Sequence, residues 1–251
     1  MSMDLTPILS DWSYEPGKIT VRVIEGDDGE AKIQVRLDLG LLQMEVAGRP
    51  DGQRPYGFES LLEYYETGLD DFLAESPEGE EFTLSGEDCR LLREEAVQYY
   101  HRYISLLVLG DYDGVVRDTM RNLRVLDLCR EYAEREEDRE VLEQFRPYIT
   151  MMWTRALASQ MIGAEEPKAA LLTIDTGIEQ IRSIYAEIAP EEAVEETTEL
   201  QLLRGMRDEL VMKLPASQKT ELRKRLQTAI EQENYELAAI LRDELRMLGD
   251  G

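Results

Sequence analysis

The spacing of apolar residues changes once along this chain of 251 residues, and that change limits what the chain can fold into. Between residues 18 and 47 apolar and polar residues alternate, which is the period of a β-strand. From residue 86 onward apolar residues recur every three or four positions, the period of an α-helix. The sequence therefore predicts the α+β class: a small three-stranded antiparallel sheet with a helix, then a mainly α-helical region and a C-terminal helical hairpin.

Three strands are predicted in the alternating segment, each with one apolar side. Asp28-Gly29 is a typical hairpin turn between the first two, and Gly40 interrupts the pattern before the third. A small sheet with one apolar face needs a cover, and we expect a helix over 57–74 to supply it. The apolar side of the sheet would carry Ile19, Val21, Val23, Ile33, Val35, Leu37, Leu39, Leu42, Met44 and Val46. The covering helix would contribute Phe58, Leu61, Leu62, Tyr65, Leu69 and Phe72.

A polar stretch at 75–86 separates the two patterns and reads as a linker. The sequence thus predicts an N-terminal α+β module at 1–75, a helical array or bundle at 86–214, and a helical hairpin at 216–251. Gly, Pro and acidic breaks divide the helical part. The predicted helices are 86–109, 112–135, 138–163, 166–188, 191–213, 217–232 and 235–248.

The charge balance excludes several functions for the body of the chain. The formal net charge is −25, and nearly all of it lies outside residues 216–251. Such a body repels phosphate backbones and anionic membranes, so we expect no direct nucleic-acid binding by it and no membrane association. Cys89 and Cys129 stand alone rather than in CxxC pairs, so we expect no zinc site and no disulfide framework. No cofactor and no catalytic residue is predicted, and the expected location is the cytoplasm.

The pattern of residues 222–248 predicts two amphipathic helices joined by a tight turn. Asn234 is expected to cap the second helix, and the small residues Ala229, Ala238 and Ala239 lie near the turn. A hairpin this short buries too little surface to be stable alone, so it must dock on its own chain or on a partner. The predicted partner-binding residues are Leu222, Leu226, Ile230, Tyr235, Ala238, Leu241, Arg242 and Leu245.

The stretch AIEQENYELAAILRDEL resembles the UVR motif, the helical hairpin of the UvrB and UvrC proteins. The matching features are acidic residues at 231–233, Tyr235, Glu236, the pair Ala238-Ala239, and Leu-Arg-Asp at 241–243. In that family the hairpin is an interaction module that pairs with another such hairpin in nucleotide-excision repair. It also occurs in Clp ATPases and in the activator of the bacterial protein arginine kinase. The resemblance therefore implies protein–protein contact rather than an activity.

The rest of the chain differs from those proteins. It has no GxxxxGK[ST] loop and no CxxC zinc pair. The segments LDLGLLQMEV and GRPDGQRPYG are similar to bacterial proteins described only as UVR-motif-containing. The resulting hypothesis is a non-enzymatic adaptor or regulator whose hairpin engages a UVR-bearing protein. That partner would be a repair subunit, a Clp-type ATPase or a second copy of this chain, which would form a homodimer.

A weaker internal similarity lies in the helical region. The junction LGDYDGVV, with Gly110, resembles the inter-helix turn of a tetratricopeptide repeat, and Gly163 aligns with Gly110 at an offset of 53 residues. That offset is not the 34 residues typical of the family. The sequence leaves a tetratricopeptide-like array and an ordinary helical bundle as alternatives.

Other residues allow alternative functions. Arg49 and Arg54 lie on the stiff loop 48–57, where their two guanidinium groups could together bind a carboxylate or a phosphate. One alternative function is therefore an enzyme of unrecognised type that uses this loop. The structural alternative is a connection whose arginines pair with nearby acids. His101 is expected to be a packing or surface residue. The helical region could also bind a small ligand. Its aromatic residues Tyr99, Tyr100, Tyr103 and Trp153 would form the core or, alternatively, a peptide groove.

Overall fold

The structure is a computed structural model that describes residues 4–75, 79–186, 191–213, 218–232 and 234–247. It divides into two compact units, residues 1–207 and 208–251. The strands are β1 (Val21–Glu25), β2 (Ala31–Arg36) and β3 (Leu41–Glu45). The α-helices are α1 (Thr6–Leu9), α2 (Leu61–Glu75), α3 (Gly86–Leu109), α4 (Tyr112–Tyr132), α5 (Glu136–Glu140), α6 (Arg146–Gly163), α7 (Pro167–Ala186), α8 (Glu191–Glu195), α9 (Thr198–Lys213), α10 (Gln218–Glu231) and α11 (Tyr235–Met247). Two short 3₁₀ helices are η1 (Pro55–Gly57) and η2 (Glu143–Phe145).

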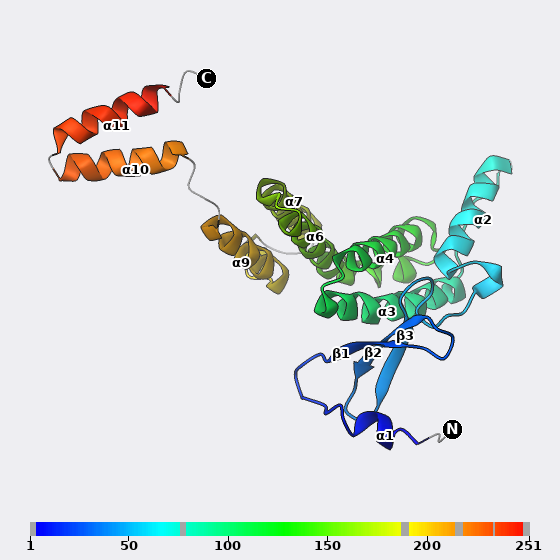
Figure 1. The fold of residues 1–251 in the computed structure, drawn as a ribbon. Coiled ribbons are helices and arrows are strands. Elements are labelled where there is room, and N and C mark those ends of the chain that lie inside the picture. Colours follow the sequence, from blue (N-terminus) through cyan, green and yellow to red (C-terminus); the bar gives the residue numbers. More distant parts are fainter. Residues whose placement is uncertain (1–3, 76–78, 187–190, 214–217, 233, 248–251) are drawn as a thin grey trace. The chain divides into compact units, whose positions relative to one another are not determined.

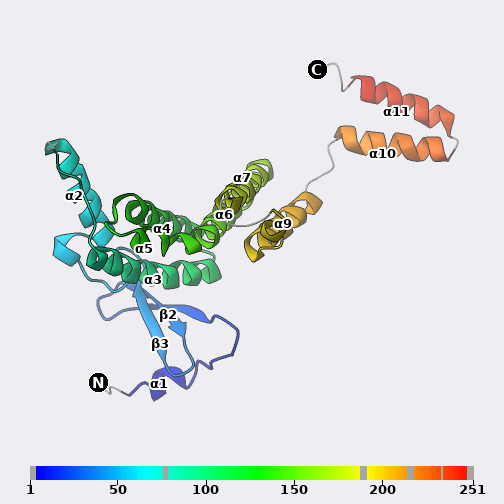
Figure 2. The same cartoon turned by 180° about the vertical axis from the view of Figure 1, so that it is seen from behind.

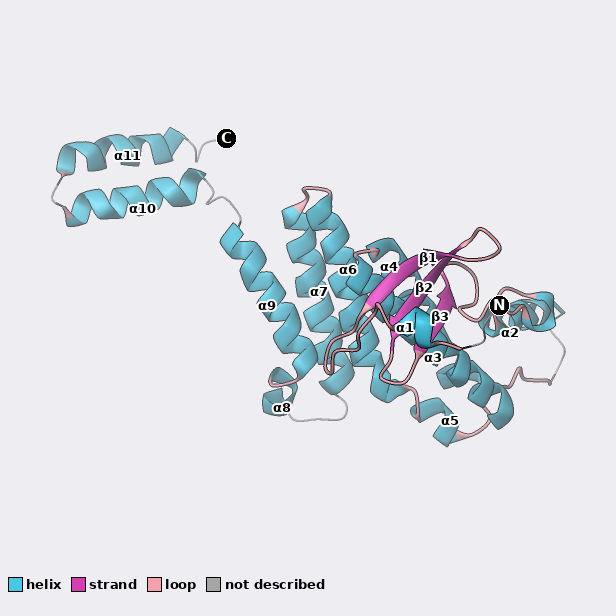
Figure 3. Ribbon diagram, turned by 60° about the horizontal axis from the view of Figure 1, so that its bottom comes forward, coloured by secondary structure: helices cyan, strands magenta, loops and turns pink. Residues whose placement is uncertain are grey.

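The predicted α+β class is confirmed. The three strands form one antiparallel sheet in the order β1-β2-β3. Ile33 of β2 lies opposite Val23 of β1 and Met44 of β3, so the alternating apolar residues share one face. Figure 3 shows the three strands, in magenta, lying together as one sheet.

The second strand is shorter than its pattern predicted. It ends at Arg36, and residues 37–40 form the turn into β3. In this turn the Leu37 amide donates to the Gly40 carbonyl at 2.9 Å. Leu37 and Leu39 are therefore exposed, Leu39 to 91%, rather than part of the buried face. Because Leu37 and Leu39 continue the apolar alternation, the spacing of apolar residues alone does not reveal the turn.

The helix that covers the sheet is α3, not the segment 57–74. α3 packs on both β1 and β2, as Figure 1 and the reverse view in Figure 2 show. The predicted covering helix begins at Leu61, as α2, and its buried residues Leu61 and Leu62 pack with the core between α3 and α4. A capping box of Ser85 and Asp88 fixes the start of α3.

The helical region contains two antiparallel helix pairs, α3 with α4 and α6 with α7, and α4 packs against α6. The predicted helix 138–163 is in fact three elements, α5, η2 and α6. Pro147 explains the break, because proline is tolerated in the first turn of a helix but not in its interior. The predicted helix 191–213 is divided into α8 and α9. Here the Thr197 hydroxyl donates to the Val194 carbonyl at 2.8 Å where α8 ends.

The structural equivalent of Gly110 is Glu165, not Gly163. Gly110 follows α3 with a left-handed φ of 77°, and the next amide, Asp111 N–H, donates to Leu106 O at 3.0 Å. After α6 the left-handed residue is Glu165, with φ 60°, and the Glu166 amide donates to Met161 O at 2.8 Å. Gly163 is the last residue of α6 itself. The two turns are thus alike in hydrogen bonding but not in sequence, and the tetratricopeptide-like interpretation stays a prediction.

The boundaries 1–75, 86–214 and 216–251 also stay predictions. The first compact unit holds both the sheet and helices α2 to α8. Within it, hydrogen bonds join the end of β3 to α3 and α4: Arg102 donates to Glu45 O at 3.1 Å, and Arg117 donates to Val46 O at 3.2 Å.

Candidate functional site

The predicted hairpin consists of α10 and α11 joined by a tight turn. At the end of α10 the Gln232 amide donates to Thr228 O at 3.0 Å, and the Asn234 amide donates back to Ala229 O at 2.8 Å. The Asn234 side-chain oxygen accepts from the Leu237 amide at 3.2 Å, which satisfies one otherwise unpaired donor at the start of α11. The predicted role of Asn234 as an N-cap is confirmed.

The interior of the hairpin is small. Ala229, Ala238 and Leu241 are buried together, with Leu226 partly buried beside them. Alanines at the contact let the two helices approach closely, but they bury little apolar area. Leu241 is 1% exposed, so among the described residues it is the one large side chain fully buried in this interior. Substituting it would disturb the hairpin itself before it disturbed any partner.

Larger apolar side chains of the hairpin face solvent. Ile230 and Tyr235 flank the turn and are 46% and 69% exposed. Leu237 and Ile240, three positions apart and thus neighbours on the surface of α11, are 37% and 56% exposed. The sequence reasoning missed this second pair, although its spacing of three is visible in the sequence. The described part of the hairpin thus exposes four large apolar side chains.

The predicted partner-binding residues thus fall into two groups. Ile230, Tyr235 and Arg242 are exposed, whereas Ala238 and Leu241 line the interior with Leu226. The side chains of Leu222 and Leu245 lie outside the described residues. The basic run 223–225 is exposed along α10.

The loop 48–57 does not join its two arginines in one site. The Arg49 Nε lies 3.4 Å from the Glu95 carboxylate and 3.2 Å from that of Asp51. Arg54 is exposed and pairs with Glu59 at 3.1 Å. Since each guanidinium already has a carboxylate partner, this geometry favours the structural interpretation of the loop over an anion-binding one.

Beneath that loop lies a buried cluster of charged side chains. Asp118 is fully buried and accepts two hydrogen bonds from Arg102, at 2.7 and 2.9 Å. Glu95 is also fully buried, pairs with Arg121, and accepts from the Leu61 amide at 2.8 Å at the start of α2. The Tyr99 ring lies under both guanidiniums, 4.8 Å from Arg102 and 4.1 Å from Arg121. These contacts connect β3, α2, α3 and α4. The buried acids therefore have a structural role, because each one is paired with an arginine.

The predicted aromatic core is only partly buried. Tyr99 and Tyr103 are buried, whereas Tyr100 and Trp153 reach the surface. A cavity of about 530 Å³ lies between α3, α4, η2 and α6. It is lined by Arg93, Ala96, Val97, Tyr100, His101, Tyr103, Asn122, Leu126, Leu142, Phe145, Tyr148 and Ile149. His101 is an exposed member of this lining, and partial desolvation by its neighbours lowers its pKa below the usual value.

Among the described residues, no group of three or more His, Cys, Asp or Glu side chains is placed to hold a metal ion. Within the same part of the chain, no helix combines the length and the apolar character needed to cross a membrane. Cys89 and Cys129 are buried free thiols.

One family model matches the chain: the UvrB/uvrC motif, over residues 216–250. The match covers the hairpin of α10 and α11 and leaves the first compact unit unassigned. No curated protein and no solved structure matches the chain. The hairpin is therefore similar to a motif that mediates contacts between proteins, and the resemblance noted in its sequence is confirmed.

Proposed function

We propose that this protein is a non-enzymatic adaptor or regulator that binds a protein partner through its C-terminal hairpin. The observation that carries the proposal is the exposure of Ile230, Tyr235, Leu237 and Ile240 on a module that matches an interaction motif. The interior of the hairpin is small and the apolar groups outside it are large. Burial of those exposed groups would stabilise both the hairpin and the complex.

The proposed partner is another protein with a UVR hairpin: a repair subunit, a Clp-type ATPase, or a second copy of this chain. Two such hairpins can cover each other's exposed apolar residues. The exposed basic run 223–225 would steer the hairpin towards an acidic surface. The acidic body does not favour nucleic acid, and the free thiols of Cys89 and Cys129 fit a reducing cytoplasm.

The test uses full-length chains that differ only on the outside of the hairpin. One double variant is Leu237→Glu with Ile240→Glu, and the other is Ile230→Glu with Tyr235→Glu. Each leaves Ala229, Ala238 and Leu241 in place. We expect at least one to weaken binding about tenfold or more, measured as the Kd for purified UVR-bearing partners and as self-association by sedimentation equilibrium.

Leu172→Glu is the matched control, because Leu172 is 70% exposed on α7 in the first unit. It should leave binding unchanged. If the wild-type chain binds neither a UVR-bearing partner nor itself, or if both hairpin variants bind as the wild type does, the adaptor proposal fails.

A second candidate function, binding of a small ligand by the helical region, is favoured by the aromatic cavity of about 530 Å³. Its volume and mainly apolar lining suit a small apolar molecule. A thermal-shift screen of apolar aromatic compounds tests this, with Tyr103→Ala as a variant in the lining; compounds that stabilise the wild type and not the variant would support it.

A further inference from the structure

The aromatic cavity between α3, α4, η2 and α6 is lined by rings from two sides. Tyr100, His101 and Tyr103 belong to α3, Phe145 to η2 and Tyr148 to α6. Tyr100 is 37% exposed and Phe145 50%, so the cavity opens to solvent beside rings that a ligand can reach. Tyr103 is 1% exposed and is the least accessible of these rings.

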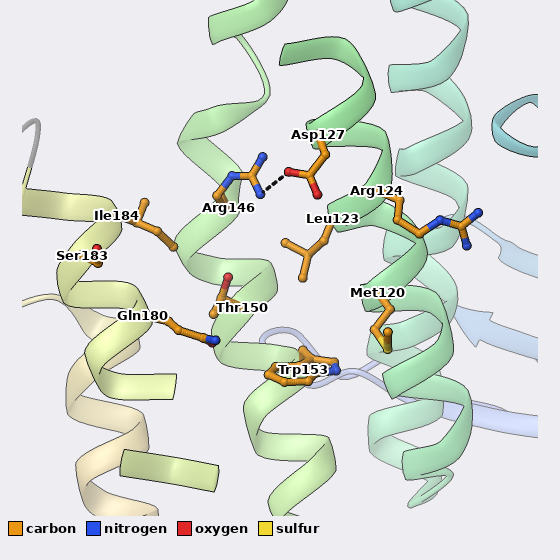
Figure 4. A pocket seen from close by; sticks show the side chains of 10 residues that line it. All are labelled: Met120, Leu123, Arg124, Asp127, Arg146, Thr150, Trp153, Gln180, Ser183 and Ile184. Atoms are coloured by element: carbon orange, nitrogen blue, oxygen red, sulfur yellow. Dashed lines mark ion pairs between the residues drawn. The ribbon is translucent and has the colours of Figure 1, made fainter. Parts of the chain in front are cut away.

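A second groove, of about 510 Å³, lies between α4, α6 and α7 and has a different character (Figure 4). Trp153 is the one aromatic residue among the described residues that line it. Arg146 and Asp127 also line it and form an ion pair at 2.9 Å, drawn as a dashed line in Figure 4. Of the two hollows, only the aromatic cavity offers several rings to one ligand.

The tyrosine rings of the cavity lie close to one another. The ring centroid of Tyr100 is 5.5 Å from that of Tyr103 and 6.3 Å from that of Tyr148. The planes of Tyr100 and Tyr103 are nearly perpendicular, at 85°, so these rings form two walls rather than a stack. A cation is attracted to an aromatic ring when it lies within about 6 Å of the ring centroid. At these separations, one cationic group would meet that distance to more than one ring.

The charges in the lining restrict the kind of cation. Among the described residues, no carboxylate lines the cavity, and the guanidinium of Arg93 already lies 2.7 Å from Asp138. Partial desolvation lowers the pKa of His101, so its ring is uncharged at neutral pH and does not repel a cation. A primary ammonium group would lose the hydration of its N–H groups here and find no carboxylate in exchange. A quaternary ammonium group has no N–H and presents methyl groups, which suit an apolar lining.

The charge of the whole chain favours a cation over an anion. The formal net charge is −25, so the surrounding field attracts cations and repels anions. The faces of aromatic rings carry partial negative charge and act in the same direction. A neutral ligand would gain only from burial of apolar surface, whereas a methylated cation would gain from burial and from the rings.

We propose that the aromatic cavity binds the quaternary ammonium head of a small organic cation, with its methyl groups against the rings of Tyr100, Phe145 and Tyr148. The volume of about 530 Å³ leaves space for the remainder of a ligand larger than the head itself. The proposal rests on the small-ligand function proposed above for the same cavity, and it names the class of ligand. It is independent of the hairpin, because every residue it uses lies within the first unit.

The test compares choline with the neutral alcohol in which a tert-butyl group replaces the trimethylammonium group. The two molecules have the same shape and differ in charge. Titrations of the full chain, followed by saturation-transfer NMR of the ligand, give a Kd for each. We expect choline to bind about 3- to 30-fold more tightly, the value of its contacts with the rings. Ethanolamine, which has a primary ammonium group in the same place, should bind more weakly than choline.

Tyr100→Leu and Tyr148→Leu each keep an apolar side chain but remove a ring. Each should bring the ratio of the two Kd values closer to one. Because both Kd values are measured in the same variant, a general loss of folded protein does not produce this change. Tyr14→Leu is the matched control, since Tyr14 is 40% exposed and does not line the cavity, and it should keep the wild-type ratio.

The outcomes separate the ligand class from the small-ligand function. If the neutral alcohol binds the wild-type chain as tightly as choline does, the proposed class is wrong and small-ligand binding still stands. If choline does not bind the wild-type chain, the proposal is overturned, and the thermal-shift screen decides separately whether the cavity binds any small ligand. An unchanged ratio in both tyrosine variants would overturn the role given to the rings.

Discussion

In the first unit, paired acidic and basic side chains lie in the interior, whereas in the hairpin every acidic or basic side chain that the structure describes is exposed. Asp118 and Arg102 are buried together, and Glu95 is buried with Arg121. The hairpin instead has two alanines and one leucine inside, and it exposes larger apolar groups such as Tyr235 and Ile240.

The two regions differ in the interactions that stabilise them. Buried ion pairs stabilise a fold only when every charge keeps its partners, so they specify one arrangement of the elements that carry them. An interior of alanines provides little burial, so the adaptor proposal expects the hairpin to gain stability from a partner. A region that specifies its own packing suits a scaffold, and a region that leaves its packing incomplete suits an interface.

The largest expected effect is from Asp118→Asn. This change leaves the Arg102 guanidinium buried without its carboxylate, so we expect the free energy of unfolding of the first unit to fall by about 3–5 kcal/mol. Urea unfolding followed by tryptophan fluorescence measures it, because Trp12 and Trp153 both lie in this unit.

The matched control is Asp71→Asn, an exposed position on α2. It should change the same free energy by less than about 0.5 kcal/mol. If Asp118→Asn were as mild as Asp71→Asn, the buried charges would not hold the first unit together, and the contrast with the hairpin would disappear.

The sequence predicted those features that depend on neighbouring residues. Alternation gave the three strands, and the helix stop and start signals gave α3, whose predicted bounds 86–109 match the structure. The cap at Asn234 is likewise a local signal that reads correctly. The alternating pattern failed at the end of β2, because Leu37 and Leu39 continue the alternation through the turn into β3.

The remaining features depend on residues far apart in the chain. Arg102 meets Glu45 across 57 positions, and Arg117 meets Val46 across 71, so no local pattern contains these contacts. The groove beside Trp153 is likewise lined by residues of three helices, α4, α6 and α7. In the hairpin, Leu226 and Ile230 belong to one apolar stripe, yet only Ile230 is exposed to a large extent. A stripe shows which side of a helix is apolar, but not how much of it a narrow partner helix can cover.

A substitution of intermediate expected effect tests how closely α6 and α7 pack. Gly177 of α7 faces Thr154 of α6 so closely that an added Cβ would lie 2.3 Å from the threonine hydroxyl. Gly177→Ala should therefore destabilise the first unit by about 1–3 kcal/mol, read from the same urea transition. Gly205→Ala on α9 is the control, because a Cβ there meets nothing within 4 Å, and it should stabilise by up to about 1 kcal/mol through helix propensity. Equal effects of the two substitutions would show that α6 and α7 can separate, and that the first unit is no more tightly specified than the hairpin.

The smallest expected effect is at the hairpin turn. Asn234→Ala removes the acceptor for the Leu237 amide and should cost the hairpin about 1 kcal/mol. Amide hydrogen exchange of α11 in the full chain measures this loss as faster exchange, while the urea transition reported by the tryptophans stays unchanged. Asn234→Asp keeps an acceptor oxygen at the same place and should exchange as the wild type does.

Because the hairpin interior is so small, a loss of this size is a large share of its own stability, yet a bound partner should restore the protection of Asn234→Ala by mass action. Protection that is the same in both variants would mean that the cap is not what starts α11, and slow exchange without any partner would mean that the hairpin is stable by itself.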